Sequence, residues 1–465
     1  MKVGKPNILF IIADDHRYDA INCFGNSEVQ TPTLDSLAEA GVSFSKTYTM
    51  SGLTGAVCVP SRAALHTGVN PFRASVSKQV EDYQNIMTLN PNLKTLPQVL
   101  RQNGYHAHAI GKWHNDKQSF AKGFDSGDKL MFQGMSNHRK VPVHDFDPSG
   151  EYLAEAYYEN QFSTELFCDQ AVNFIENYQN DKPFFLYLAL TAPHDPRTAP
   201  AKYRDMYYQN QLSLPENFME QHPFDNGELC IRDEQLAPFP RTPEVVREHL
   251  ADYYAMITHM DEQIERVLQT LEESGKDQET IIIYTADHGL AVGQHGLMGK
   301  QNMYEHSLHI PFIIKGKGIP KEKKVDALTC QYDIFPTLCD LVGLPIPETV
   351  EGQSQVPLLI GTSGNHRDSV YAVYGDVQRM VRDERWKLIK YYQSSKKDTG
   401  SDRIQLFDLE EDPWEKNDLS DDPLQHERIK QLLRKLTNWQ ERVGDPLMVP
   451  VTTRNMSNDK NNLGC

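Results

Sequence analysis

Long apolar segments are missing from this sequence of 465 residues. Uninterrupted apolar runs such as Ile8 to Ala13 and Phe184 to Leu190 are far shorter than the roughly 20 residues that a transmembrane helix needs. Internal repeats and low-complexity tracts are also absent, which argues against repeat architectures. With 39% hydrophobic and 24% charged residues, the composition is that of a soluble globular protein, and the length allows one large domain and a smaller one.

Positive charge is scarce. The chain has 47 Lys and Arg against 64 Asp and Glu, so its net charge is 47 − 64 = −17. Because nucleic-acid-binding proteins need an excess of basic residues, non-specific binding to nucleic acid is excluded. An anionic ligand would have to be attracted by a local cationic pocket, since the field of the whole protein repels it.

Cysteine is sparse and no Cys-x-x-Cys motif occurs, which excludes a zinc ribbon and a disulfide-dense scaffold. The seven cysteines are Cys23, Cys58, Cys168, Cys230, Cys330, Cys339 and Cys465. Cys330 and Cys339 could pair across a helix, although free buried thiols fit equally well. No signal peptide is visible at the N-terminus. Either the protein is cytoplasmic or a leader has been removed.

Continuous apolar runs alternate with segments of helical periodicity along the first 290 residues. The runs at 7–13, 184–190 and 280–286 predict buried strands, and 105–110 is also interpreted as a strand. Helices are predicted at 33–40, 96–103, 160–178 and 244–274, with Thr33 as a candidate N-cap. This alternation is typical of a doubly wound α/β fold with a large, mixed, mostly parallel sheet sandwiched by helices. Residues 199–243 are polar and rich in Pro, Asn and Gln, and we interpret them as a long excursion over the active-site face.

A second, smaller unit is predicted at the C-terminus. Residues 360–368 contain three small linker-type residues, and short strands are predicted at 370–374, 385–391 and 405–409, with a helix at 427–442. The sequence therefore predicts a catalytic domain over 1–362 and an α+β subdomain with a small antiparallel sheet over 363–465.

Acidic residues follow two of the predicted strands directly. Asp14 and Asp15 end the first strand, and Asp287 and His288 end the strand at 280–286. Each pair alone would suit turn chemistry or helix capping. Because ligand sites in open α/β sheets lie beyond the carboxyl ends of the strands, we expect the two pairs to meet. Three carboxylates and an imidazole with mostly oxygen donors favour Ca²⁺ or Mg²⁺ over Zn²⁺.

The stretch Cys58-Val59-Pro60-Ser61-Arg62 carries the candidate nucleophile. Proline is tolerated in the first turn of a helix, so a helix is predicted to begin near Cys58, with Arg62 four residues later on the same face. A thiol beside carboxylates would be a poor nucleophile, because they raise its pKa and suppress the thiolate. This setting favours an oxygen nucleophile at position 58.

Three further motifs follow in order: Gly111-Lys112-Trp113-His114, Pro193-His194-Asp195-Pro196 and Gly296-Leu297-Met298-Gly299-Lys300. Together with the acidic pairs at the strand ends and the stretch that begins at Cys58, they resemble the motifs of the type I, formylglycine-dependent sulfatases of the alkaline phosphatase superfamily. The resemblance covers residues 7–314, with a looser match around Phe407-Asp408-Leu409.

The resemblance implies that a maturation enzyme oxidises Cys58 to formylglycine, and that Asp14, Asp15, Asp287 and His288 hold one divalent cation with it, usually Ca²⁺. His288 stands where Asn is common, as in the iduronate-2-sulfatase and choline-sulfatase branches. Arg62, Lys112, His114, His194 and Lys300 are implied to be catalytic. Arg197 and His306 are weaker candidates for contacts with substrate, beside Lys112, His194 and Lys300.

The implied reaction is the hydrolysis of sulfate esters, with Asp287 as proton acceptor from the nucleophile and His194 as acid for the leaving alcohol, Lys300 being the competing acid. A sulfated saccharide is the expected substrate. A phosphodiesterase or phosphonate monoester hydrolase of the same superfamily, or an anion-binding protein if Cys58 stays a thiol, are the alternatives. Since a weak oxygen site fills best where Ca²⁺ is abundant, we expect a periplasmic or secreted protein.

Overall fold

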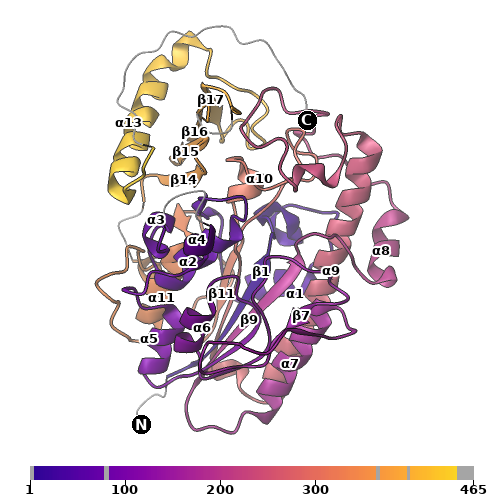
Figure 1. The fold of residues 1–465 in the computed structure, drawn as a ribbon, viewed down its shortest axis with the longest axis vertical. Helices are drawn as coiled ribbons and strands as arrows, with labels where there is room; N and C mark the ends of the chain where they lie inside the picture. The colour runs from indigo at the N-terminus through magenta and orange to yellow at the C-terminus, as the bar shows by residue number, and fades with distance from the viewer. Residues whose placement is uncertain (1–4, 78–82, 363–366, 395–397, 448–465) are drawn as a thin grey trace.

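The computed structural model describes residues 5–77, 83–362, 367–394 and 398–447, and its centre is an eight-stranded sheet (Figure 1). The strand order is β12-β2-β11-β10-β1-β9-β5-β6. These strands are β1 (Asn7–Asp14), β2 (Val42–Phe44), β5 (His106–Lys112), β6 (Ser126–Met131), β9 (Phe184–Pro193), β10 (Thr280–Ala286), β11 (Phe312–Lys315) and β12 (Lys323–Val325). The five strands from β10 to β6 run parallel, and β11 is antiparallel to β10. The predicted mixed, mostly parallel sheet is confirmed.

Helices cover both faces of this sheet. Successive residues of β1 point to opposite faces, and both sets of side chains are buried. Leu9 and Ile11 pack against one group of helices, whereas Ile8 and Phe10 pack against the other. The first group is α1 (Pro32–Glu39), α7 (Ser163–Asn177), α8 (Ala201–Tyr208) and α9 (Pro243–Glu273). The second group is α2 (Cys58–Thr67), α5 (Leu96–Gln102), α6 (Lys117–Gly123) and α11 (Ile334–Leu341). Since both faces are buried, the strands are apolar throughout, as the sequence shows.

A second sheet lies beside the first, in the upper part of Figure 1. Its order is β17-β16-β15-β14-β4, and the strands are β4 (Ser51–Gly52), β14 (Val370–Tyr374), β15 (Gln378–Arg382), β16 (Trp386–Tyr391) and β17 (Arg403–Asp408). The last four are antiparallel and pack with α13 (His426–Val443), which confirms a C-terminal α+β unit. However, β4 comes from the first domain and pairs with β14. Residues 363–366 of the predicted linker lie outside the described residues.

Several short elements complete the described chain. They are β3 (Thr47–Tyr48), β7 (Pro142–Val143), β8 (Tyr157–Tyr158), β13 (Thr329–Cys330), α3 (Pro71–Ala74), α4 (Tyr83–Met87), α10 (Glu305–Leu308) and α12 (Val356–Leu359). Cys330 and Cys339 are both free and buried, so they do not pair with each other. No helix within the described ranges has the length and apolar content needed to cross a membrane.

Parallel strands bring their carboxyl ends to one edge of the sheet. In the register of the structure, Ala13 pairs with Ala286, and Asp14 pairs with Pro193. The next residues along each strand are Asp15, Asp287 and His194. The topology therefore brings the chemical motifs of three strands together.

Candidate active site

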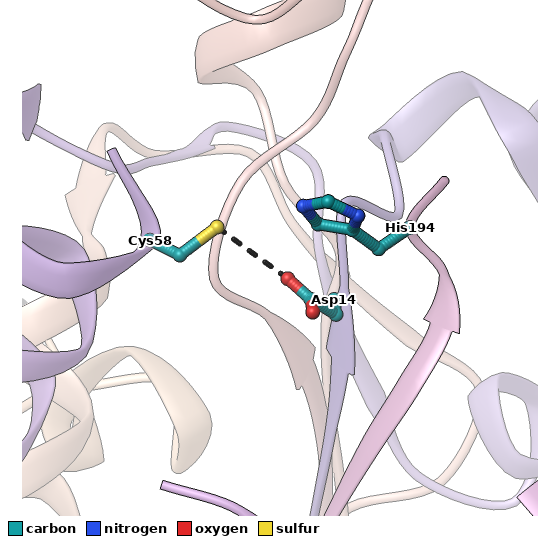
Figure 2. A group of neighbouring side chains, drawn as sticks. All are labelled: Asp14, Cys58 and His194. Carbon is teal, nitrogen blue, oxygen red and sulfur yellow. Dashed lines mark hydrogen bonds between the residues drawn. The ribbon is translucent and has the colours of Figure 1, made fainter. Parts of the chain in front are cut away.

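Four side chains converge beyond the carboxyl ends of β1 and β10. One potential ligand atom from each of Asp14, Asp15, Cys58 and Asp287 lies within 4.8 Å of the others, and all four residues are buried. A second grouping joins Asp14 and Cys58 to His194. In Figure 2 the Cys58 thiol, on the first turn of α2, points toward the Asp14 carboxylate, with Sγ 3.4 Å from Oδ1, and the His194 ring lies beside them.

Hydrogen bonds to the residue that follows β10 fix the backbone conformation of the loop after β1. Asp15 has φ of +67°, in the left-handed region that is uncommon for residues other than glycine. Its backbone N–H donates to Asp287 Oδ1 at 3.1 Å, and the Asp287 N–H donates to Ala13 O. These bonds hold the unusual backbone and bring the carboxylates of two strand ends together.

Helix α2 presents Cys58 at its first position, as the sequence predicts. All ten residues of α2 are buried, and Arg62 lies one turn after Cys58. The Arg62 guanidinium donates from Nε to Asp287 Oδ2 at 2.7 Å and from Nη1 to Lys112 O at 2.8 Å. Arg62 therefore connects the helix of the candidate nucleophile to the strand ends that carry Asp287 and Lys112.

Two lysines neutralise the first acidic pair. Lys112 forms an ion pair with Asp14 and donates to Gly134 O. Lys300 lies 2.7 and 2.6 Å from the two carboxylate oxygens of Asp15 and 3.1 Å from Cys58 Sγ. Burial alone would lower the pKa of Lys300, but Asp15 and the groups around it raise it well above its ordinary value. Lys300 is therefore a cation at the candidate nucleophile.

His194 faces the cluster with one ring nitrogen. Its Nδ1 lies 2.7 Å from Asp195 O, and its Nε2 lies 3.5 Å from Asp15 Oδ2. If Nδ1 carries the proton and donates to that carbonyl, Nε2 is left to act at the cluster. His194 is therefore placed among the groups that the sequence predicted it would join.

His114 is buried beside the cluster, and neither ring nitrogen has a hydrogen-bond partner among the described residues. A Cβ added to Gly134 would lie 2.6 Å from His114 Nε2, so only glycine leaves room for the ring. Burial, assisted by Lys112, lowers the pKa of His114 well below its ordinary value. The imidazole is neutral and has a lone pair available as a base.

His288 is not part of the grouped ligand atoms. Its Nδ1 lies 2.7 Å from Gly289 O, and its Nε2 lies 3.3 Å from Ser51 Oγ. Burial lowers the pKa of His288 to about 3, so the ring is neutral. A neutral imidazole suits a metal, but this ring is directed to Ser51, and its role as the fourth ligand stays a prediction.

The two weaker substrate candidates lie apart from each other. Arg197 has Nη1 2.7 Å from His249 Nδ1, and Nη2 3.4 Å from Met298 O in the loop that carries Lys300. His306 instead lines a separate cavity together with Tyr18. The structure thus brings Arg197 toward the catalytic loop and places His306 elsewhere.

The sequence interpretation missed an acidic and basic pair at the edge of the site. Asp195 forms a two-point ion pair with Arg232 and lies 3.3 Å from His194 Nδ1. Arg232 belongs to the polar excursion, and its neighbour Asp233 accepts a hydrogen bond from Gln301 at 2.8 Å. The predicted position of residues 199–243 over the site indicated the region, but no local pattern singled out Arg232.

The charges of the cluster suit a cation. Burial raises the pKa of Asp15 to about 6, despite Lys300. For Asp14, burial also raises the pKa, but Lys112 and His194 outweigh it and hold the pKa well below its ordinary value. Three acidic groups thus lie together in a buried space, each beside one basic side chain, and a hard divalent cation bound among them would further offset their mutual repulsion. The donor set fits Ca²⁺ or Mg²⁺ better than Zn²⁺.

A working thiolate does not fit this site. Burial raises the pKa of the Cys58 thiol well above its ordinary value, Asp287 raises it further, and Lys300 does not offset them. The thiol is therefore a weak nucleophile, which agrees with an oxygen nucleophile at this position.

Comparison with known proteins assigns the fold and the family. The family model "Sulfatase" matches residues 6–344, and the model "N-sulphoglucosamine sulphohydrolase, C-terminal" matches residues 293–442. An N-acetylglucosamine-6-O-sulfatase from Bacteroides thetaiotaomicron is 28% identical over 95% of this chain and 87% of that protein.

Solved structures share the architecture. A protein solved in complex with its substrate D-glucosamine-2-N,6-O-disulfate superposes with a TM-score of 0.78, at 24% identity, over 95% of this chain and 99% of that one. A phosphonate monoester hydrolase from Agrobacterium radiobacter, at 22% identity, gives 0.74 over 94% of this chain and 96% of that one. With the family model matching most of its length, the chain belongs to the sulfatase family of sulfuric ester hydrolases.

Proposed function

We propose that this protein removes sulfate from a sulfated saccharide, with formylglycine formed from Cys58 as the nucleophile. The observation that carries the proposal is the position of Cys58. Its buried Sγ lies 3.4 Å from Asp14, 3.7 Å from Asp15 and 3.1 Å from Lys300, where a thiolate is disfavoured and an oxygen nucleophile is suited.

Asp14, Asp15 and Asp287 would hold a divalent cation, Ca²⁺ or Mg²⁺, with position 58 and His288 completing the site. The cation and the formylglycine would together supply an activated oxygen nucleophile and positive charge toward the sulfate. Arg62 fixes Asp287 through the 2.7 Å ion pair, and so orients the carboxylate that we propose as proton acceptor.

The remaining cations would bind the sulfate. Lys112 pairs with Asp14, and Lys300 pairs with Asp15. A cation bound by the carboxylates would leave both ammonium groups free to turn to sulfate oxygens. This would stabilise the negative charge that develops in the transition state.

Two imidazoles are proposed to move protons. His194, protonated at both ring nitrogens, would give its Nε2 proton to the leaving alcohol while Nδ1–H stays on Asp195 O, and Lys300 is the competing acid. His114, neutral and without a hydrogen-bond partner in the described structure, would take the proton that must leave before sulfate is expelled. Each role uses a nitrogen that other contacts leave available.

A sulfated sugar is the proposed substrate. The relative named N-acetylglucosamine-6-O-sulfatase and the neighbour solved with a disulfated glucosamine support this class. The polar excursion over the site, with Arg232 ion-paired to Asp195 and half exposed, supports a pocket for one saccharide end. Arg197 near the Lys300 loop is a further proposed contact.

One partner and a location follow from the same chemistry. A maturation enzyme must oxidise Cys58 before the protein can act. A periplasmic or extracellular site of action is proposed, because an oxygen-rich site fills most readily where Ca²⁺ is abundant.

The proposal is tested by measuring sulfate release from a panel of defined sulfated mono- and disaccharides, an aryl sulfate and an aryl phosphodiester. The protein must first be shown by peptide mass to carry the converted residue at position 58. We expect turnover of one sulfated sugar position and none with Cys58→Ala, while Cys168→Ala, at another buried free cysteine, stays active.

Turnover of the phosphodiester alone would assign the chain to phosphonate or phosphodiester hydrolysis. Sulfate release by Cys58→Ala at the wild-type rate would refute the nucleophile. Binding of sulfate esters without turnover by converted protein would indicate an anion-binding protein.

A further inference from the structure

A cavity lies outside the cluster of the proposed catalytic residues. It has a volume of about 250 Å³, is partly open to solvent, and is lined by the turn after β1, by α10 and by the loop that follows β17. Its lining includes Tyr18, Asn217, Gln294, His306, His309 and Trp414, and contains none of the grouped metal-ligand candidates. A Cβ added to Gly289 would lie 2.2 Å from His306 O, so the loop that follows Asp287 packs against one wall of this cavity.

One side of the cavity is built from stacked rings. The Tyr18 and His309 rings are stacked with centroids 3.9 Å apart, and Phe24 and Tyr48 extend the stack on either side at 4.5 and 5.0 Å. Trp414 also lines the cavity and is 39% exposed. Its carbonyl accepts a hydrogen bond from Asn217 Nδ2 at 2.9 Å, which fixes the backbone at this residue. Because Phe24 and Tyr48 cover the two ends of the stack, Tyr18 and His309 present only ring edges to the cavity. The partly exposed Trp414 ring is left for contact with the apolar side of a ligand.

The charged side chains that line the cavity are all engaged. Asp19 pairs with Arg17, and Lys46 pairs with Asp326 and Glu384. Glu305 is bound by Arg382 and by Lys387, which also pairs with Glu415. Each cation is thus balanced by a carboxylate, so the cavity does not offer the free positive charge that a sulfate or a carboxylate ligand would need.

The neutral polar groups, in contrast, are left with unused hydrogen-bonding capacity. Neither ring nitrogen of His306, which is 6% exposed, has a partner among the described residues, and the same holds for His309 Nε2 and Asn217 Oδ1. Burial lowers the pKa of both imidazoles, so each is neutral. His306 offers one donor and one acceptor, whereas His309 has only Nε2 available, because its Nδ1 faces Glu305 Oε2 at 3.6 Å. Groups of this kind match hydroxyls, which also donate and accept.

We propose that this cavity is a binding site for an uncharged sugar unit, separate from the catalytic cluster, with Trp414 against the sugar ring, the edges of Tyr18 and His309 beside it, and His306 and Asn217 at its hydroxyls. This proposal rests on the proposed function in one respect, namely that the substrate is a saccharide. An unsulfated unit of the saccharide would be held there while sulfate is removed at position 58.

Ligand-observed saturation-transfer NMR and calorimetry on the full-length protein test this site. The probes are methyl β-glucoside, methyl β-galactoside and N-acetylglucosamine, all uncharged. We expect at least one to bind to the wild type and equally to Cys58→Ala, without competition from inorganic sulfate. Trp414→Ala should weaken binding about tenfold or more, while its hydrolysis of a small aryl sulfate stays at the wild-type rate.

Two further variants test the role of the His306 nitrogens and provide a control outside the cavity. His306→Phe retains a ring against Tyr304 (centroids 5.6 Å apart in the wild type) but removes both nitrogens, and should also weaken binding. Tyr158→Ala removes a 56% exposed aromatic residue that does not line the cavity, and should bind normally. Circular dichroism would establish that each variant is folded.

The site is refuted if no uncharged glycoside binds, if Trp414→Ala and His306→Phe bind as the wild type does, or if sulfate or Cys58→Ala abolishes binding. Sulfate release without sugar binding would refute this site alone. Sugar binding here by a protein that releases no sulfate would refute the proposed function alone.

Discussion

At the scale of single residues, the site depends on which atom of each side chain is still free. His194 is the clearest case, since Asp195 O lies at Nδ1 while Nε2 faces Asp15. Asp195 is itself held by Arg232. A histidine oriented in this way can deliver a proton to one fixed place, which is what a leaving alcohol requires.

We expect His194→Ala to slow hydrolysis of alkyl and sugar sulfates about a hundredfold or more, the ordinary size of a general acid's contribution. Aryl sulfates, whose phenolate leaves without a proton, should lose much less. The measurement is kcat/KM for leaving groups of graded pKa, in the wild type and the variant. His249→Ala, at a histidine that contacts Arg197, serves as the control and should show no such dependence on the leaving group. Equal losses for aryl and sugar sulfates in His194→Ala would argue that the residue only positions substrate.

At the scale of elements, helix α1 depends on a residue far away in the chain. The helix begins at Pro32, and its first residues have no side-chain cap of their own. The backbone N–H groups of Thr33 and Leu34 instead donate to the two carboxylate oxygens of Asp261, at 2.9 Å each, from helix α9. The prediction of Thr33 as N-cap is therefore wrong, because Thr33 lies inside the helix and a buried carboxylate does the capping.

Asp261→Ala should reduce the free energy of unfolding by about 1–2 kcal/mol, the usual effect of losing a cap. Chemical denaturation of the two proteins measures this difference. Glu265→Ala, at an exposed position one turn further along α9, is the matched control and should change stability little. An Asp261→Ala protein as stable as the wild type would show that the packing of α1 alone maintains its first turn.

At the scale of the whole molecule, the parallel sheet concentrates negative charge at one edge. Asp14, Asp15 and Asp287 are all buried there, and Lys112, Lys300 and Arg62 pair with them one by one. A ligand that binds only the folded state stabilises it by mass action, so a bound cation should raise the melting temperature. The metal therefore links the stability of the fold to the activity of the site.

Removal of divalent ions with a chelator should abolish sulfate release and lower the melting temperature, and Ca²⁺ should restore both. Differential scanning calorimetry and sulfate release would be followed on the same sample. Asp14→Asn should lose the response of the melting temperature to Ca²⁺. Asp19→Asn, at a carboxylate outside the cluster, should keep it. Full activity in chelator would refute the metal site, and restoration by Zn²⁺ alone would indicate a different metal chemistry.

The sequence alone determined the architecture and the main chemical groups. Apolar runs that end in Asp14, His194 and Asp287 are sufficient to place these residues at one edge, because parallel strands share that edge. The start of α2 at Cys58 could likewise be predicted, because Pro60 is tolerated in the first turn of a helix. Both inferences depend on local backbone preferences and on the periodicity of burial, which the sequence carries directly.

Only the tertiary structure decided which distant groups complete these elements. Asp261 caps α1 from 227 or more positions away, β4 joins the C-terminal sheet, and His306 lines a cavity separate from the catalytic cluster. Arg232 meets Asp195 only because the chain from 199 to 243 folds back over the strand ends. Such contacts depend on how packed elements are oriented in space, and no short-range pattern of apolar and polar residues records that orientation.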